Sequence, residues 1–307
     1  MSTGIVLKPV VDKLSCVFYI HDLGVQKEVH LRLKDLLGNP AAPEYQQADF
    51  KSYKLGIYAM SVKLVEPNTK QPFLIQAQPK SKKIKNFMRF EWNPSKLGPD
   101  GMAFFRKRLT QIFQGSFTYA DLLQDGKVTR VDAAIDLVNV SIDDVLIVTK
   151  TPEKSIVYHG TDGGTETIYL GASKHLKRGH TAIYNKQQQL DDVGRTEKFG
   201  GVPLTRIEAR PKTSTPIVNL PLLPNPLKEI ILMIPGEVEP PEENHHWMFF
   251  LDSCRYLGIK GALAKLPDAI VPKYTEALEL ATHVSWDTDK VWSYWGEALE
   301  KTGLLDV

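Results

Sequence analysis

Alternating polar and apolar residues mark four segments in the middle of the chain as strands that each bury one face. These segments are residues 128–138 (VTRVDAAIDLV), 165–172 (TETIYLGA), 180–186 (HTAIYNK) and 203–211 (PLTRIEARP). Successive side chains of a strand point to opposite faces, so every second residue shares a face. The pattern therefore predicts a sheet with one apolar face and one face that carries charged and hydroxyl groups.

The segments between these strands predict the topology. Residues 141–150 (SIDDVLIVTK), with Ser141 as the N-cap, and residues 186–193 (KQQQLDDV) are predicted helices, and residues 173–179 (SKHLKRG) form a basic hairpin loop. The resulting order, β-α-β-β-α-β, is that of the ferredoxin-like unit, in which the first strand lies between the third and the fourth. We therefore expect an α+β fold with a ferredoxin-like antiparallel sheet.

The remaining chain divides at a segment rich in proline. Nine prolines fall between Pro203 and Pro241, and proline neither continues a helix nor donates to a sheet ladder. Apolar residues at three-to-four spacing then predict helices in residues 247–266, 274–284 and 291–305, whose tryptophans and phenylalanines are expected to form a small helical core or a dimer interface. The predicted regions are 1–125 (α+β), 126–215 (ferredoxin-like), 216–241 (Pro-rich connection) and 242–307 (C-terminal helical appendage).

Composition and charge narrow the class of protein. The 307 residues are 42% hydrophobic and 24% charged, with two cysteines, which excludes a disulfide framework and a thiolate metal site. No apolar run approaches the roughly 18 residues that span a bilayer, and the first residues lack the pattern of a signal peptide. We therefore expect a cytoplasmic protein with no membrane partner.

The charge is unevenly distributed. Residues 236–307 hold 13 acidic and 6 basic side chains, so the rest of this +2 chain is strongly basic. Basic clusters lie at residues 80–85 (KSKKIK), 106–108 (RKR) and 174–178 (KHLKR). This asymmetry fits nucleic-acid binding, because phosphate neutralisation needs local positive charge; the alternative is a set of solvated surface lysines.

The polar face of the predicted sheet gathers groups that suit phosphoryl chemistry. Tyr184 shares a face with Lys186, and Glu208 and an aspartate lie on strands about 4.8 Å apart. Residues four apart on one strand are separated by about 13 Å, so Asp132 and Asp136 cannot share one ion. One of them is expected to join Glu208 at a metal, and the other to pair with Arg206 or Arg210; the sequence does not decide which.

These groups suggest a nucleophilic mechanism. A phenol is a weak nucleophile until a neighbouring charge favours its phenolate. A Mg²⁺ or Mn²⁺ ion held by Asp132 or Asp136 and Glu208 would polarise a scissile phosphate, and Lys186 would stabilise the developing charge. Attack by Tyr184 would yield a phosphotyrosine bond and a free 3′-hydroxyl.

The motifs RVDAAID, TIYLGASK, TAIYNK and TRIEARP resemble those of the Rep_trans family of rolling-circle replication initiators, which act on plasmids and on some filamentous phages. The resemblance implies metal ligands at Asp132, Asp136 and Glu208, with Tyr184 and Lys186 as the catalytic pair. It also implies nicking of an origin duplex, attachment to the 5′ end of the resulting single strand, homodimers, and host helicase and polymerase as partners in a bacterial cytoplasm. Two segments depart from the family pattern, ASKHLKRG after YLG and KQQQLDD after the tyrosine.

We expect the first region, residues 1–125, to grip DNA beside the catalytic region. FMRFEWNP (87–94) repeats the spacing of LTRIEARP (204–211) and places Glu91 where Glu208 lies, so it is either a degenerate copy of the same fold or a chance match. The residues expected to contact DNA are basic: Lys82, Lys83, Arg130, Lys174, Lys177, Arg178, Arg206 and Arg210.

Three alternatives to tyrosine nicking are open at the level of the sequence. A non-catalytic single-strand nucleic-acid-binding module would use Tyr169 and Tyr184 as stacking platforms, although carboxylates on the same face would repel phosphate. A water-activating metal-dependent nuclease would leave Tyr184 structural. A conjugative relaxase would need a His-x-His metal cluster, whereas His245 and His246 are adjacent and are expected to cap or pack.

Overall fold

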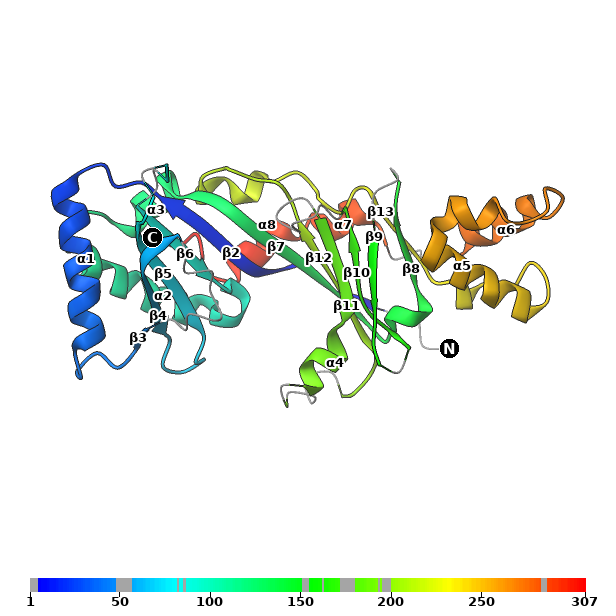
Figure 1. Ribbon diagram of the computed structural model, residues 1–307, viewed down its shortest axis with the longest axis horizontal. Coiled ribbons are helices and arrows are strands. Elements are labelled where there is room, and N and C mark those ends of the chain that lie inside the picture. The colour runs from blue at the N-terminus through cyan, green and yellow to red at the C-terminus, as the bar shows by residue number, and fades with distance from the viewer. Residues whose placement is uncertain are drawn as a thin grey trace. The chain divides into compact units, whose positions relative to one another are not determined.

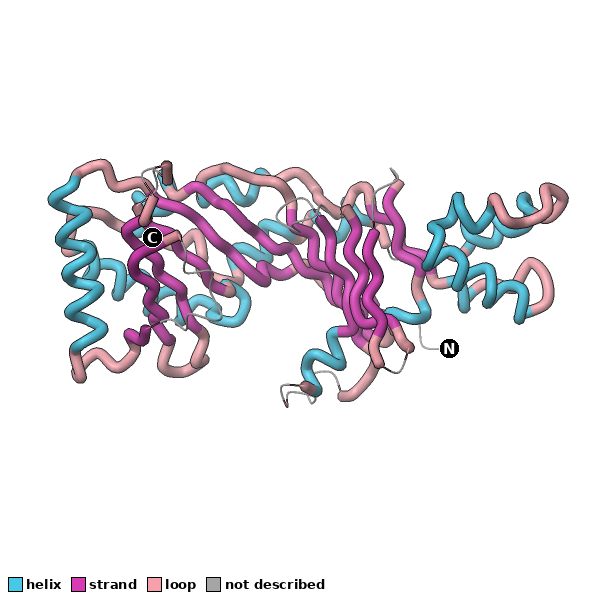
Figure 2. The backbone as a smooth tube through the Cα atoms, in the orientation of Figure 1, coloured by secondary structure: helices cyan, strands magenta, loops and turns pink. Residues whose placement is uncertain are grey.

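The chain forms two compact units, each assembled from segments that are far apart in the sequence. The computed structural model describes residues 5–47, 57–81, 83–84, 87–150, 155–161, 163–171, 180–192, 194, 200–282 and 286–307. Unit 1 comprises residues 1–8, 135–209 and 225–293, and unit 2 comprises residues 9–134, 210–224 and 294–307. The sequence had instead suggested contiguous regions. The expected α+β class with an antiparallel sheet is confirmed (Figures 1 and 2).

Unit 2 contains an antiparallel sheet in the strand order β3-β4-β5-β6-β2-β7. Its strands are β2 (Val10–Phe18), β3 (Tyr45–Gln47), β4 (Tyr58–Val65), β5 (Pro72–Pro79), β6 (Met88–Trp92) and β7 (Lys127–Val138). Only residues 127–134 of β7 belong to this unit. The alternation in β6 places Met88, Phe90 and Trp92 in the core and leaves Arg89 and Glu91 on the opposite face.

Aromatic stacking joins this sheet to its helices. The helices of unit 2 are α1 (Leu23–Gly38), α2 (Pro94–Phe113), α3 (Tyr119–Asp125) and α8 (Trp295–Glu300). The Phe105 ring of α2 stacks on Phe73 of β5, with centroids 4.0 Å apart. Trp295 is buried and donates its indole N–H to the Leu220 carbonyl at 2.9 Å. The end of the chain is therefore part of the core of unit 2 and not of the helical appendage that the sequence predicted.

Unit 1 contains the four strands predicted from the middle of the chain. The end of β7 lies beside β12 (Leu204–Arg210), followed by β11 (His180–Asn185), β10 (Thr165–Leu170) and β9 (Ser155–His159), and β1 (Ile5–Val6) pairs with β7. Ile135, Ile183 and Ile207 fill the core face of the sheet, as the alternation predicts. One detail of the expected order is wrong, because β12 separates β7 from β11.

The expected helix over residues 141–150 is also absent from the described structure. Residues 142–144 form a short 3₁₀ turn, η1 (Ile142–Asp144), which Ser141 caps, and β8 (Leu146–Thr149) follows. The segment is rich in β-branched residues, which favour strands. It pairs with β13 (Ile230–Met233), the apolar stretch inside the Pro-rich connection. The partner strand, more than 80 residues away, therefore decides the conformation of this segment.

The helices of unit 1 are α4 (Lys186–Asp191), α5 (Asn244–Leu263), α6 (Val271–Leu280) and α7 (Thr288–Trp292). The rings of Trp247, Phe250 and Tyr274 form the small helical core that the sequence suggested. Gly258, with φ of 72°, interrupts α5 because that backbone conformation favours glycine. Within the described residues, no helix is long and apolar enough to cross a membrane.

Candidate active site

Strand β11 presents Tyr184 on the open face of the unit 1 sheet. The preceding residue, Ile183, is fully buried in the core, so alternation turns Tyr184 to the opposite face, where it is half-buried. The Asn185 side chain accepts a hydrogen bond from the Gln188 backbone N–H and caps α4. This cap ends the strand directly after Tyr184, so the phenol lies at the junction between a strand and a helix.

The phenol of Tyr184 is hydrogen-bonded to a buried carboxylate. Tyr184 Oη donates to Glu208 Oε1 at 2.5 Å, and Glu208 is only 5% exposed. This length falls in the range of charge-assisted O–H···O⁻ bonds. Glu208 is thus positioned to receive the phenolic proton, which is the geometric requirement for a general base.

A cation lies next to the same phenol. Lys186 Nζ is 5.8 Å from the centroid of the Tyr184 ring and donates to Gln189 Oε1 at 2.5 Å. A lysine at this distance interacts favourably with the ring face. Lys186 therefore places a positive charge beside the Tyr184 ring.

The two aspartates predicted as metal ligands are each held by arginine. Arg206 donates to both oxygens of buried Asp136, at 2.6 and 2.7 Å. In unit 2, Arg130 donates to both oxygens of Asp132 at 2.8 and 2.5 Å, and Arg210 pairs with Asp132 at 3.0 Å. The sequence left open whether an aspartate would pair with Arg206 or with Arg210. In the structure, Asp136 pairs with Arg206 and Asp132 pairs with Arg210. Neither aspartate fits a metal in this arrangement, because guanidinium groups occupy its oxygens.

The predicted DNA-binding residues are only partly described. Arg130, Arg206 and Arg210 are engaged with the aspartates, and Lys83 is exposed. Lys82, Lys174, Lys177 and Arg178 lie outside the described residues. The roles assigned to these basic residues stay predictions.

Sequence reasoning named Glu91 but missed its ion-pair partners, and it missed strand β9. In unit 2, Glu91 accepts a hydrogen bond from Ser15 at 2.9 Å and pairs with Lys13 at 2.7 Å and with Arg89. In unit 1, strand β9 carries Tyr158, whose ring contacts that of Tyr169. The alternation in SIVYH was the available signal for β9.

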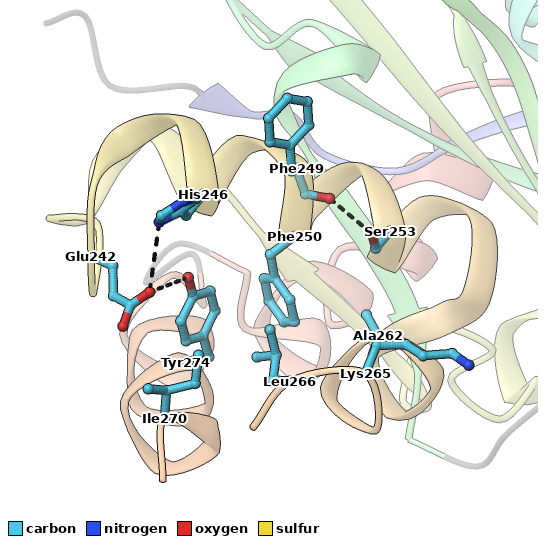
Figure 3. A pocket seen from close by; sticks show the side chains of 10 residues that line it. All are labelled: Glu242, His246, Phe249, Phe250, Ser253, Ala262, Lys265, Leu266, Ile270 and Tyr274. Atoms are coloured by element: carbon cyan, nitrogen blue, oxygen red, sulfur yellow. Dashed lines mark hydrogen bonds and ion pairs between the residues drawn. The ribbon is translucent and has the colours of Figure 1, made fainter. Parts of the chain in front are cut away.

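The helices α5 and α6 enclose a separate pocket of about 330 Å³ (Figure 3). Its floor is apolar, with Phe250 and Leu266, and at its rim the Tyr274 hydroxyl donates to Glu242 at 3.2 Å. None of the residues predicted for the nicking site lines it. Next to the pocket, Glu243, His245 and His246 are exposed, and their possible ligand atoms lie within 4.8 Å of one another. Within the described part of the chain, this is the group of three side chains that could hold a metal ion.

The two thiols are not candidate nucleophiles. Cys16 and Cys254 are both buried. Burial raises the pKa of each thiol to about 12, and only the thiolate is a good nucleophile. Neither cysteine is therefore available for nucleophilic attack on a substrate.

Comparisons with known proteins found likenesses among solved structures. No family model and no curated protein matches this chain. A solved structure described as "Structure of Rolling Circle Replication Initiator Protein from Geobacillus stearothermophilus" is similar over 84% of this chain and 99% of that chain, with 19% identity and a TM-score of 0.42. That protein is of the class that the sequence motifs resemble. A likeness of this size carries no argument about function, which therefore rests on the residues of this chain.

Proposed function

We propose that this protein is a replication initiator that nicks one strand of DNA through Tyr184 and remains joined to the 5′ phosphate. The observation that carries the proposal is the hydrogen bond from Tyr184 Oη to Glu208 Oε1. It pairs a nucleophile with a base on the open face of a sheet, with Lys186 beside the ring. An enzyme of this kind would act on an origin duplex and on the single strand released from it.

The proposed reaction is an in-line transesterification. Tyr184 Oη attacks the scissile phosphorus while Glu208 accepts the phenolic proton. The bond from phosphorus to the 3′ oxygen breaks, and that oxygen takes up a proton to become a free 3′-hydroxyl. Lys186 stabilises negative charge on the phenolate and on the phosphoryl oxygens. The covalent product keeps the energy of the phosphodiester, so the reverse step can reseal the strand.

A Mg²⁺ or Mn²⁺ requirement is a separate part of the proposal. Because Asp136 and Asp132 are ion-paired with arginines, an ion at Glu208 would need one aspartate to exchange its arginine for the metal. The steps above are therefore written for the side chains alone. Chelation with EDTA followed by addition of Mn²⁺ or Mg²⁺ tests whether the reaction depends on an ion.

The wider biology follows from the sequence resemblance and belongs to the same proposal. It comprises a homodimer, host helicase and polymerase as partners, a bacterial cytoplasm as the site of action, and unit 2 as a region that grips DNA. On one face of the unit 2 sheet, Lys13, Arg89 and Arg130 are ion-paired with the carboxylates of Glu91 and Asp132, so the DNA-gripping role of unit 2 rests on the sequence alone.

The decisive experiment detects the covalent product without knowledge of the origin. The full-length protein is incubated with Mn²⁺ and a single-stranded library that contains a random region, and complexes that resist SDS are isolated and sequenced. The matched control is Tyr256→Phe, which changes a 76%-exposed tyrosine on α5 in the same unit. We expect adducts with wild type and with Tyr256→Phe and none with Tyr184→Phe, and a tryptic peptide that carries nucleotide on Tyr184.

The other outcomes separate the alternatives. Cleavage by Tyr184→Phe that equals wild-type cleavage would remove Tyr184 as the nucleophile and favour a nuclease that activates water. If wild type and Tyr184→Phe both bind the library and neither cleaves it, a non-catalytic single-strand-binding module would be favoured.

A further inference from the structure

Three neighbouring strands of unit 1 bring aromatic side chains onto the face that carries Tyr184. In the antiparallel ladder, Thr167 of β10 lies directly opposite both Tyr184 of β11 and Tyr158 of β9. Residues directly opposite each other in such a ladder point to the same side of the sheet. Tyr158 and Tyr184 therefore share one face, two strand spacings or about 10 Å apart.

Tyr169 continues this row. It lies two residues after Thr167, so it shares the face, and its ring meets Tyr158 at 5.9 Å and 87° and His180 at 6.0 Å and 61°. The edge-to-face angles and spacings are those of favourable aromatic pairs. The three rings thus form a continuous row from β9, at the end of the strand order, to the start of β11.

The outer end of this row, on strand β9, is accessible to solvent. Tyr158 is 50% exposed and its neighbour on the same face, Ile156, is 40% exposed. On β11, the two residues that face Tyr169 are buried, since Ala182, directly opposite it, is 3% exposed and His180 is 4% exposed, so the accessible part of the row lies on β9 and β10. Strands at the edge of a sheet commonly carry charges that prevent unwanted pairing, yet SIVYH contains no acidic residue, lysine or arginine. The exposed side chains of Ile156 and Tyr158 lie on the face opposite the hydrophobic core, which Ile168 and Ile183 contact. This exposed apolar surface is therefore not part of the core.

We propose that Tyr158 and Tyr169 form a base-stacking subsite for single-stranded DNA whose scissile phosphate lies at Tyr184. The subsite rests on the proposed nicking function and gives it a way to hold the strand. Every base offers a π face, so aromatic platforms bind unpaired bases with little sequence preference. A nucleotide adjacent to the scissile phosphate can reach across the 10 Å between Tyr184 and Tyr158 and place its base on the rings. Stacking requires an unpaired base, so the subsite favours a melted strand over a duplex.

The test separates stacking from phosphate binding by removing the bases from the ligand. Fluorescence anisotropy measures the affinity of the full-length protein for a labelled 15-nucleotide oligodeoxythymidine and for an abasic strand of the same length and charge. Wild type is expected to bind the thymidine strand at least tenfold more tightly. Tyr158→Leu and Tyr169→Leu are each expected to weaken that binding about tenfold and to leave abasic binding unchanged, whereas Tyr158→Phe and Tyr169→Phe retain it. Phe249→Leu, which changes a 70%-exposed ring on α5, is the matched control and is expected to have no effect.

Equal binding of the two strands by wild type would overturn the subsite, and this comparison needs no variant to fold. Leucine variants that keep the wild-type preference would overturn it as well. The adduct assay separates this failure from failure of the nicking function. Adducts through Tyr184 together with no base preference would refute the subsite alone, while a base preference without adducts would refute nicking and retain the stacking surface.

Discussion

Strands β6 and β12 carry the same Arg-x-Glu pattern but use it differently. In β6, Arg89 pairs with Glu91 of its own strand, and Lys13 and Ser15 of the neighbouring β2 complete the contacts of that carboxylate. In β12, Arg206 instead binds Asp136 of β7, and Glu208 accepts the proton of Tyr184. The same three-residue pattern therefore gives an ion-paired cluster in unit 2 and a tyrosine–carboxylate pair in unit 1.

This difference matters for proton transfer. Burial raises the pKa of Glu91, but the charges of Arg89 and Lys13 lower it more, so that it lies at about 2. A carboxylate with so low a pKa is a poor acceptor for a phenolic proton, because a base works best when its pKa lies near the working pH. In unit 1, the Asp136 carboxylate of β7 accepts from Arg206 through both of its oxygens, so the partner on the adjacent strand differs between the two Arg-x-Glu patterns.

The largest expected effect concerns the two glutamates. Glu208→Gln removes the proton acceptor of Tyr184 and is expected to lower the rate of adduct formation about 10²- to 10⁴-fold. Glu91→Gln is expected to change that rate less than about threefold, since Glu91 contacts no tyrosine in the described contacts and an amide of equal size causes little disturbance. Equal losses in the two variants, measured by gel quantification of the adduct, would contradict the functional distinction between the units.

The two arginines are expected to differ in their effect on stability. Arg206→Met leaves buried Asp136 without its partner, which is expected to cost about 3–5 kcal/mol in the free energy of unfolding. The Arg89 side chain is 26% exposed and Glu91 keeps Lys13, while the bonds of Arg89 to Glu91 and Gln76 are lost, so Arg89→Met is expected to cost less, about 1–2 kcal/mol. Urea unfolding followed by circular dichroism measures both values. A smaller loss for Arg206→Met than for Arg89→Met would show that the buried pair does not stabilise unit 1.

The low pKa of Glu91 also predicts how acid affects the stability of unit 2. Its folded pKa of about 2 lies below the ordinary value of 4.5, so its contribution is fully present above pH 4.5 and is lost as the pH falls toward 2. The loss over this window is expected to be about 3 kcal/mol. In Glu91→Gln this part of the pH dependence disappears, which urea unfolding at a series of pH values measures. A variant with the same slope as wild type would assign the acid sensitivity to other carboxylates.

The smallest effect is expected for the hydroxyl that supports Glu91. Ser15→Ala removes one donor to a carboxylate that retains two cations, so the free energy of unfolding is expected to fall by about 1 kcal/mol. The rate of adduct formation is expected to stay at the wild-type value. A slower rate in Ser15→Ala would link the Glu91 cluster to the reaction and so weaken the contrast between the two glutamates.

Periodicity in the sequence was sufficient to identify β7, β10, β11 and β12 and the faces of their side chains. Ile183 and Ile207 lie in the core, and Tyr184 and Glu208 lie opposite, because alternation is a local property of extended backbone. The N-cap role of Ser141 was also readable, since a hydroxyl binds the backbone two residues ahead. The roles of Tyr184, Lys186, Glu208 and the aspartates in catalysis and metal binding stay predictions.

Only the tertiary structure decided which strands are neighbours and which charges pair. The sequence placed β11 beside β7, whereas β12 lies there, and the 141–150 segment became a 3₁₀ turn and a strand because β13 pairs with it. The choice of Asp136 as the partner of Arg206 likewise depends on strand order, and it sets Glu208 apart from Glu91. Such contacts join residues that are distant in the chain, so no local pattern specifies them. The face to which each side chain points is different, because it follows from the alternation of the extended backbone alone.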